Sequence, residues 1–464
     1  MGRKGILENI RLPARASMWY IGANIVSKAI AIAVTPFLTR IQSEEDYGAF
    51  ALYISVLGIA SVAVSAFTSG SSVYKGLGEF SNEKGSYFKS ILLASTAFSV
   101  IICTLLFAFS YLLPINRDII PLILLQMIFD STVAVYLSGA RFSYLYKPVV
   151  VISIFESLLS PILAIAWLRA SGGGYKIRIY SMLVASFIAA AYALYRISKE
   201  RGKVKLNILK YSIRGSLSLL PHSLAGALSA QSDKLIFTAM LGNAALARYS
   251  VAHSVGAGLS FVVGGLGAAL SPWIMRRLNA KENERIYEIC ELIFKGLAAA
   301  TIALIALAPE AMLILAPPEY SDALIAILPI ALSVLPSYIH LITTVILVQF
   351  DKSKYTSYSS VITLASGVLL NFILIPSMQY FGAGVALLIS QGLGALISLR
   401  FMHKLCGVSL PTKSFLYYFI LSIFFGALAL GLYQHLALRV LLLTIPAVIM
   451  LGSLFSTERL IREK

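Results

Sequence analysis

Apolar stretches long enough to cross a bilayer follow one another along almost the whole chain, and only short polar segments separate them. A hydrocarbon core of roughly 30 Å requires about 20 apolar residues in a helix. The pattern therefore predicts an all-α integral membrane protein with about 14 transmembrane helices. The predicted spans are residues 17–39, 48–70, 89–113, 119–140, 149–169, 179–197, 215–241, 250–274, 291–316, 323–349, 355–376, 382–402, 414–434 and 438–456.

The composition agrees with this prediction. Of the 464 residues, 58% are hydrophobic and only 13% are charged, whereas a soluble domain has about 25% charged residues. The cysteines Cys103, Cys290 and Cys406 lie far apart, and the five histidines are scattered. These spacings favour neither a disulfide framework nor a metal site, and we expect no cofactor.

The basic residues indicate how the chain is oriented. A formal net charge of +17 could indicate a nucleic-acid partner, but in a membrane protein the positive-inside rule explains such an excess better. With a cytoplasmic N-terminus, most lysines and arginines fall in cytoplasmic segments, and the acidic cluster Glu44–Asp46 falls outside. The loop from Arg169 to Arg178 breaks the pattern. We expect a multi-pass protein of the cell inner (cytoplasmic) membrane with both termini cytoplasmic and no nucleic-acid partner.

A basic segment after the sixth span divides the predicted helices. Tyr47-Gly48 opens the second span and Tyr249-Ser250 opens the eighth, which is a weak internal echo. Together these features predict two pseudo-symmetric six-helix lobes around a central cavity, plus a C-terminal helix pair. The predicted parts are an N-terminal lobe (1–197), a basic cytoplasmic connector (198–214), a C-terminal lobe (215–402), and the helix pair with a cytoplasmic tail (403–464).

Several ionisable residues lie inside predicted spans, among them Lys28, Asp130, Glu156, Asp233 and Lys234. An unpaired charge at the centre of a membrane helix costs roughly 2.5–3.5 kcal/mol. A chain that keeps several such charges is expected to enclose a polar pathway, which indicates a transporter of polar or charged cargo. The alternatives are a lysine that reaches an interface, a structural pairing of charges between helices, or an interfacial position for Glu156.

Enzyme signals are missing from the sequence. There is no Walker A motif, and no segment between spans is long enough for a soluble catalytic domain. We therefore expect that the protein is not an enzyme. A membrane glycosyltransferase or polysaccharide polymerase is the alternative from a different class.

Three motifs resemble signatures of the Wzx-type polysaccharide (O-antigen) flippases, within the multidrug/oligosaccharidyl-lipid/polysaccharide exporter superfamily. The motifs are Thr39–Gly48, then Pro221 with Asp233-Lys234, Met240–Gly242 and Tyr249, and finally Asn371–Pro376 with Phe381–Gly384. The resemblance implies alternating access and movement of undecaprenyl-diphosphate-linked oligosaccharide from the cytoplasmic to the periplasmic leaflet. It also implies a place in O-antigen and lipopolysaccharide biosynthesis, contact with membrane lipids, and polysaccharide polymerases as partners.

On this resemblance, polar residues of the spans receive roles in binding the cargo and in coupling. The residues expected to bind diphosphate or sugar are Lys28, Lys234, Asn24, Arg141, Arg248 and Gln231. The residues expected to couple transport to a proton or ion gradient, as in an antiporter, are Asp233, Asp130 and Glu156. The membrane potential acting on fixed cations is the other driving force considered. A lipid II flippase and a multidrug exporter of the same superfamily are the alternative transporters.

Overall fold

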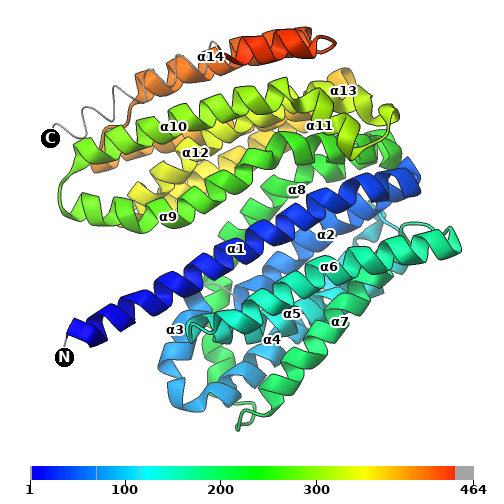
Figure 1. The fold of residues 1–464 in the computed structure, drawn as a ribbon. Coiled ribbons are helices and arrows are strands. Elements are labelled where there is room, and N and C mark those ends of the chain that lie inside the picture. The colour runs from blue at the N-terminus through cyan, green and yellow to red at the C-terminus, as the bar shows by residue number, and fades with distance from the viewer. Residues whose placement is uncertain (1–2, 69–70, 113, 445–464) are drawn as a thin grey trace. The chain divides into compact units, whose positions relative to one another are not determined.

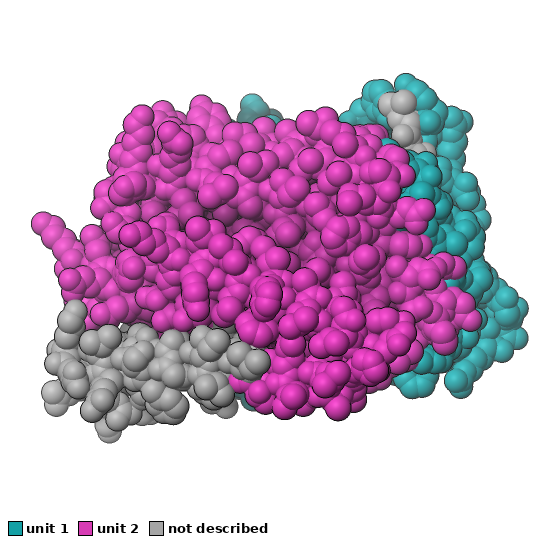
Figure 2. All heavy atoms as spheres, turned by 90° about the horizontal axis from the view of Figure 1, so that it is seen from above, with its two compact units in different colours: residues 1–246 teal, residues 247–464 magenta. Residues whose placement is uncertain are grey.

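The computed structural model describes residues 3–68, 71–112 and 114–444, and within them every regular element is helical. The contacts between Cα atoms divide the chain into two compact units, residues 1–246 and 247–464 (Figure 2). The predicted all-α fold is therefore confirmed. Each unit is described by itself below.

The first unit is built from long helices that pack side by side (Figure 1). Within it α1 packs on α6, α6 and α5 pack on α7, and α4 packs on both α2 and α5. Its α-helices are α1 (Arg3–Ile41), α2 (Glu44–Thr68), α3 (Ser71–Glu79), α4 (Lys84–Ala108), α5 (Ile120–Phe142), α6 (Tyr146–Ser171), α7 (Lys176–Ser198) and the first part of α8 (Leu206–Gly256). Its short 3₁₀ helices are Ser81–Glu83, Ser110–Leu112 and Arg117–Ile119.

The second unit is centred on α12, which packs against α9, α10, α13 and α14. Small residues permit some of these approaches, since Gly256 and Gly384 both lie against the side chain of Ile330. The α-helices after α8 are α9 (Ser260–Asn279), α10 (Asn283–Ala306), α11 (Ala308–Leu315), α12 (Ile327–Gln349), α13 (Ser353–Cys406) and α14 (Thr412–Gly431). The 3₁₀ helices are Ala257–Leu259 and Pro318–Ala326.

Eleven helical segments of the described residues are long and apolar enough to cross a membrane. They are Met18–Ile41, Glu44–Glu79, Ser81–Ala108, Arg117–Phe142, Tyr146–Ser171, Lys176–Ser198, Ser223–Gly267, Asn283–Ala306, Pro318–Gln349, Ser353–Cys406 and Thr412–Gly431. These segments overlap every predicted span except the last. Most of that span, 438–456, lies outside the described residues.

Two of the eleven segments each correspond to two predicted spans, because the chain turns inside them. Gly242 in α8 has φ 83° and ψ 177°, and Gln379 in α13 has φ 46° and ψ −121°, so neither residue is helical. The turn in α13 is tight: a Cβ on Gly382 would lie 2.2 Å from the carbonyl oxygen of Leu374. A glycine is therefore required there, within the motif Phe381–Gly384.

The first part of α8 packs along α2, which places it in the first unit. The Ser216 hydroxyl donates to the carbonyl oxygen of Ala66 over 2.8 Å, and the amide of Asn243 donates to Glu45 Oε1 over 2.8 Å. These contacts lie at opposite ends of α2, so the two helices run antiparallel. The compact units therefore divide at residue 246, whereas the predicted N-terminal lobe ends at 197. The functional boundary between lobes stays a prediction.

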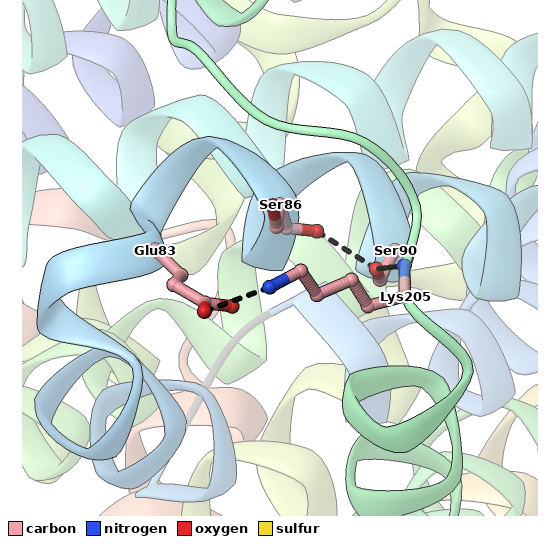
Figure 3. Close-up of polar contacts among 4 residues, drawn as sticks. All are labelled: Glu83, Ser86, Ser90 and Lys205. Atoms are coloured by element: carbon pink, nitrogen blue, oxygen red, sulfur yellow. Dashed lines mark hydrogen bonds and ion pairs between the residues drawn. The ribbon is translucent and has the colours of Figure 1, made fainter.

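The first half of the predicted connector forms hydrogen bonds with the beginning of α4 and with the 3₁₀ helix that precedes it (Figure 3). The Lys205 ammonium donates to Glu83 Oε1 over 2.7 Å, and the Lys205 amide donates to the Ser90 hydroxyl over 3.1 Å. Lys89 donates to the carbonyl oxygens of Glu200 and Gly202, each over 3.0 Å. Helix α8 then begins at Leu206, so the second half of the connector is helical.

Candidate functional site

All the predicted site residues except Arg248 belong to the first unit. They come from four of its helices, α1, α5, α6 and α8. The structure brings Asp130 and Glu156 together in one cluster, places Lys234 in contact with Gln231, and places the others separately.

Asp130 and Glu156 lie in a polar cluster that includes residues of four helices. The side-chain amide of Gln126 donates to Asp130 Oδ1 over 2.7 Å, and it also donates to the hydroxyl of Ser186 over 2.7 Å. Gln126 and Asp130 are four residues apart on α5, so they share a helix face, and Ser186 comes from α7. The contact therefore ties the carboxylate of α5 to its neighbouring helix.

The other members of the cluster come from α6 and α2. The carboxyl groups of Asp130 and Glu156 interact electrostatically across α5 and α6. The Tyr53 hydroxyl of α2 also interacts electrostatically with Asp130. Tyr53 is fully buried at 0% exposure. We call Tyr53, Gln126, Asp130, Glu156 and Ser186 the carboxyl cluster.

The carboxyl cluster has unused hydrogen-bonding capacity. Neither the Tyr53 hydroxyl nor the Gln126 side-chain oxygen hydrogen-bonds to any residue that the structure describes. A buried polar atom without a protein partner calls for a water, an ion or another explanation. Two carboxyl groups on adjacent helices, with donors around them, form a site that can hold and release a proton or bind a cation.

Helix α8 carries three predicted residues along one turn. The Lys234 ammonium donates to Gln231 Oε1 over 3.2 Å, and the Gln231 side chain lies near Gly58 of α2. Asp233 is buried, with 5% of its surface exposed. Gln231 and Lys234 are both half-buried. Adjacent residues of a helix point about 100° apart, which accounts for the unequal burial of Asp233 and Lys234.

Helix α1 presents Asn24 and Lys28 on an exposed face. Ser27 points instead toward α6, where its hydroxyl lies 3.5 Å from the carbonyl oxygen of Ser153. Ile25, which is 64% exposed, shares the face of Lys28. A cation on such a mixed face is costly if it contacts only lipid, and its placement along a polar pathway stays a prediction.

The two predicted arginines have different contacts. Arg141 is half-buried in the last turn of α5 and interacts electrostatically with Tyr20 of α1. Arg248 forms an ion pair with Asp322, with 2.7 Å between Nη1 and Oδ2. Arg248 lies in the second unit and is held there by an acidic residue, so its charge has a structural partner.

Some polar residues of the structure were missed in the sequence. Gln126 could have been found, because it lies one helical turn before Asp130. Lys295 is 7% exposed and lies 3.0 Å from Glu291 Oε1 in α10, and the same carboxylate oxygen accepts a hydrogen bond from Ser414 of α14 over 2.8 Å. The sequence places Lys295 within a predicted span, and its spacing of four residues from Glu291 could have indicated the ion pair.

The first motif of the resemblance occupies one end of the first unit. The Tyr175 amide donates to Asp46 Oδ1 over 2.9 Å, and the Arg178 guanidinium lies 3.7 Å from the centre of the Phe50 ring. A Cβ on Gly48 would lie 1.8 Å from the carbonyl oxygen of Asn243. These contacts give the acidic residue and the glycine of this motif structural roles where α2 meets α7 and α8.

Comparisons with known proteins agree with this architecture. The chain is similar to the lipid II flippase MurJ in an inward closed conformation, with 14% identity, a TM-score of 0.71, and coverage of 96% of this chain and 100% of that one. An inward-facing multidrug resistance MATE family transporter has 13% identity, a TM-score of 0.65, and coverage of 83% and 94%. The Vibrio cholerae MATE transporter VcmN in the bent form has 14% identity, a TM-score of 0.56, and coverage of 89% and 98%.

At these identities the solved structures establish the fold alone, which is that of MurJ and MATE transporters. No curated protein matches the chain. The family described as polysaccharide biosynthesis protein matches residues 14–277, which is more than half of the sequence. The match includes the carboxyl cluster and the three predicted residues of α8. This chain therefore belongs to the polysaccharide biosynthesis protein family.

Proposed function

We propose that the protein is a flippase that moves undecaprenyl-diphosphate-linked oligosaccharide from the cytoplasmic to the periplasmic leaflet by alternating access. The observation that carries the proposal is the family match over residues 14–277 in a chain with a transporter fold. A saccharide attached to a lipid needs a polar route for its hydroxyl groups, since burying each one without a partner costs roughly 1–3 kcal/mol.

Among related transporters, a lipid-linked cargo is favoured over a drug. The similarity to MurJ extends over 96% of this chain, whereas the similarity to the MATE transporters covers 83% and 89%. MurJ is a flippase of lipid II, so the protein with the more extensive similarity moves a lipid. The embedded residues also include two lysines, Lys28 and Lys234, and cations suit a diphosphate better than an organic cation.

In the proposed cycle the cations receive the diphosphate and neutral polar side chains accept sugar hydroxyls. Lys28 and Lys234 are the main phosphate ligands, with Arg141 as a further cation at the end of α5. Asn24 lies one turn from Lys28, and Gln231 accepts a hydrogen bond from the Lys234 ammonium. Arg248 would join them only after releasing Asp322.

The main test is the location of the lipid-linked oligosaccharide in cells. When the protein is removed, the intermediate should accumulate on the cytoplasmic leaflet. Replacing Lys28 by Ala should reproduce this defect, because the diphosphate loses a charged ligand. Lys199→Ala is the matched control, since Lys199 is an exposed cation at the end of α7. Normal translocation by the Lys28 variant at normal membrane expression would disprove its role in binding cargo.

Asp233 has a separate test as a coupling residue. Asp233→Asn keeps the size of the buried side chain but cannot exchange a proton. If this carboxylate couples transport to a proton gradient, flux in the variant should no longer respond to an imposed pH difference. Full proton dependence of flux in Asp233→Asn would remove Asp233 from the coupling role and leave the carboxyl cluster or the membrane potential.

A lipid II flippase is the second candidate, favoured by the similarity to MurJ. The two functions differ in which pathway the chain supports. Rescue of peptidoglycan synthesis in cells that lack their lipid II flippase would favour this candidate over a polysaccharide flippase. Chemical conversion of lipid-linked sugars by the purified protein would contradict both functions and indicate a polymerase or glycosyltransferase.

A further inference from the structure

A second site lies in the first unit, at the end that the basic residues predict to be cytoplasmic. The end of α5, the start of α6 and the last turns of α7 enclose a pocket of about 780 Å³. It shares no residue with the carboxyl cluster. No role assigned above uses it.

The chemistry of the pocket is apolar with two cations. Its lining includes aliphatic and aromatic side chains such as Val151, Phe155 and Ile188, together with Lys147 and Arg196. The only other polar groups of the lining side chains are the hydroxyls of four tyrosines. The lining contains no serine, threonine, asparagine, glutamine or acidic residue, so it offers little to a saccharide.

The two cations are available to an external anion. The Arg196 guanidinium donates to the Tyr192 hydroxyl over 3.0 Å and lies 5.8 Å from the centre of the Tyr136 ring. Among the described residues, neither Arg196 nor Lys147 forms an ion pair with a carboxylate. The tyrosine rings therefore orient Arg196 without neutralising its charge.

The turn at the mouth of the pocket is held in one conformation. The amides of Tyr144 and Leu145 donate to the carbonyl oxygens of Arg141 and Ala140 over 3.0 and 2.8 Å. This is the pattern of a Schellman motif, and Tyr144 occupies its left-handed position with φ 54°. A tyrosine is unusual where glycine is preferred, and here it places an aromatic ring in the lining of the pocket.

We propose that this pocket binds an anionic phospholipid of the cytoplasmic leaflet. The phosphate lies between Arg196 and Lys147, and an acyl chain follows the apolar surface of Val151, Phe155 and Ile188. Charge complementarity favours an anion, and basic pockets between helices on the cytoplasmic side are known to take anionic lipid head groups. The lack of groups for sugar hydroxyls distinguishes this lipid from the proposed cargo.

The test measures lipid binding to the full-length protein in detergent by native mass spectrometry. Phosphatidylglycerol should bind more tightly than zwitterionic phosphatidylethanolamine. The double variant Arg196→Gln/Lys147→Gln should weaken phosphatidylglycerol binding by about tenfold or more, since each cation near an anionic lipid contributes about fivefold. Lys199→Gln/Lys203→Gln is the control, because it removes two exposed cations outside the lining.

A third variant separates the pocket from general surface charge. Val151 is 65% exposed, so Val151→Trp can fill the pocket while the fold and both cations are kept. It should weaken phosphatidylglycerol binding, whereas the control should not. Equal binding of both phospholipids, or unchanged binding in the double variant, would overturn the proposal. Displacement of phosphatidylglycerol by equimolar undecaprenyl phosphate would also overturn it, because the pocket would then belong to the cargo lipid.

Discussion

Arg439 is a single side chain that fixes the segment after α14 to the rest of the second unit. It is 2% exposed, and its guanidinium forms two hydrogen bonds to the Glu310 carboxylate, over 2.8 and 2.5 Å. It also donates to the carbonyl oxygen of Ala306. Bidentate charge-assisted hydrogen bonds of this kind are stronger than neutral ones. Removing one partner leaves the charge of the other uncompensated.

Replacing Arg439 by Met should lower the free energy of unfolding by about 2 kcal/mol. The loss should be smaller than for a fully buried pair, because water can still solvate the partly exposed Glu310 carboxylate. The double variant Arg439→Met/Glu310→Gln should recover part of the loss. Thermal unfolding in detergent at pH 7 measures both effects. Equal stability of the single variant and the wild type would show that the ion pair contributes nothing.

The same pair predicts how stability depends on pH. Glu310 lies in α11, after the segment Asn283–Ala306 that is long enough to cross a membrane. The hydrogen bond from Arg439 holds the pKa of the Glu310 carboxyl below the usual value. Its contribution is therefore complete above the unfolded-state pKa of about 4.3 and is lost as the pH falls through the lower folded-state pKa. The midpoint temperature of thermal unfolding of the wild type should decrease as the pH is lowered below about 4. This decrease should be smaller in Arg439→Met/Glu310→Gln.

At the residue scale, the sequence identifies charged side chains within apolar spans, but it does not predict which of them contact one another. Asp130 and Glu156 were recognisable as carboxyl groups within apolar spans, and in the structure the two groups interact electrostatically. Their proximity depends on how α5 and α6 are packed and rotated, which a single sequence does not encode in a readable pattern. The hydrogen bond that Ser186 accepts from Gln126 was not predicted either, because it also depends on how two helices pack.

At the scale of elements, the close packing of α2 and α8 depends on a missing side chain. A Cβ at Gly48 would overlap the carbonyl oxygen of Asn243, which is backbone and cannot rotate away. Beside this contact, Asn243 donates to Glu45 and the chain turns at Gly242. The glycine of the motif Thr39–Gly48 is thus explained by the approach of two backbones.

Replacing Gly48 by Ala should therefore destabilise the protein by about 2 kcal/mol or more, as overpacking against a fixed backbone does. Gly22→Ala is the matched control, because Gly22 lies in α1 and a Cβ there would meet nothing within 4 Å. Helix propensity alone should make the control neutral or slightly stabilising. Similar thermal midpoints for the two variants would contradict this account of the α2–α8 contact.

Most of the helices follow from apolar length, because a membrane requires helices of one minimum length. Their exact limits were less predictable: α1 begins at Arg3, well before the predicted span at residue 17, since a helix can continue into polar sequence. The turns inside α8 and α13 were correctly placed between spans, near Gly242 and Gln379. The packing of α8 along α2 was not predicted, because it is a contact between distant parts of the sequence.

At the scale of the whole molecule, the first unit contains all but one of the residues for which cargo binding or coupling is proposed. It contains the carboxyl cluster, the charged turn of α8 and the exposed face of α1 with Lys28. The second unit has two ion pairs with buried cations and partly exposed carboxylates, Lys295 with Glu291 and Arg439 with Glu310. We therefore expect the residues that respond to a proton gradient to lie in the first unit.

This expectation predicts the behaviour of the carboxyl cluster during transport. Asp130→Asn and Glu156→Gln should each reduce the dependence of translocation on an imposed pH difference across proteoliposomes, because each removes one of two interacting proton-binding groups. If the pair acts as a unit, the double variant should be little worse than either single variant. Glu83→Gln is the control, since Glu83 is an exposed carboxylate paired with Lys205 at the protein surface. Additive losses would indicate two independent sites, and full proton dependence in the double variant would contradict coupling through this cluster.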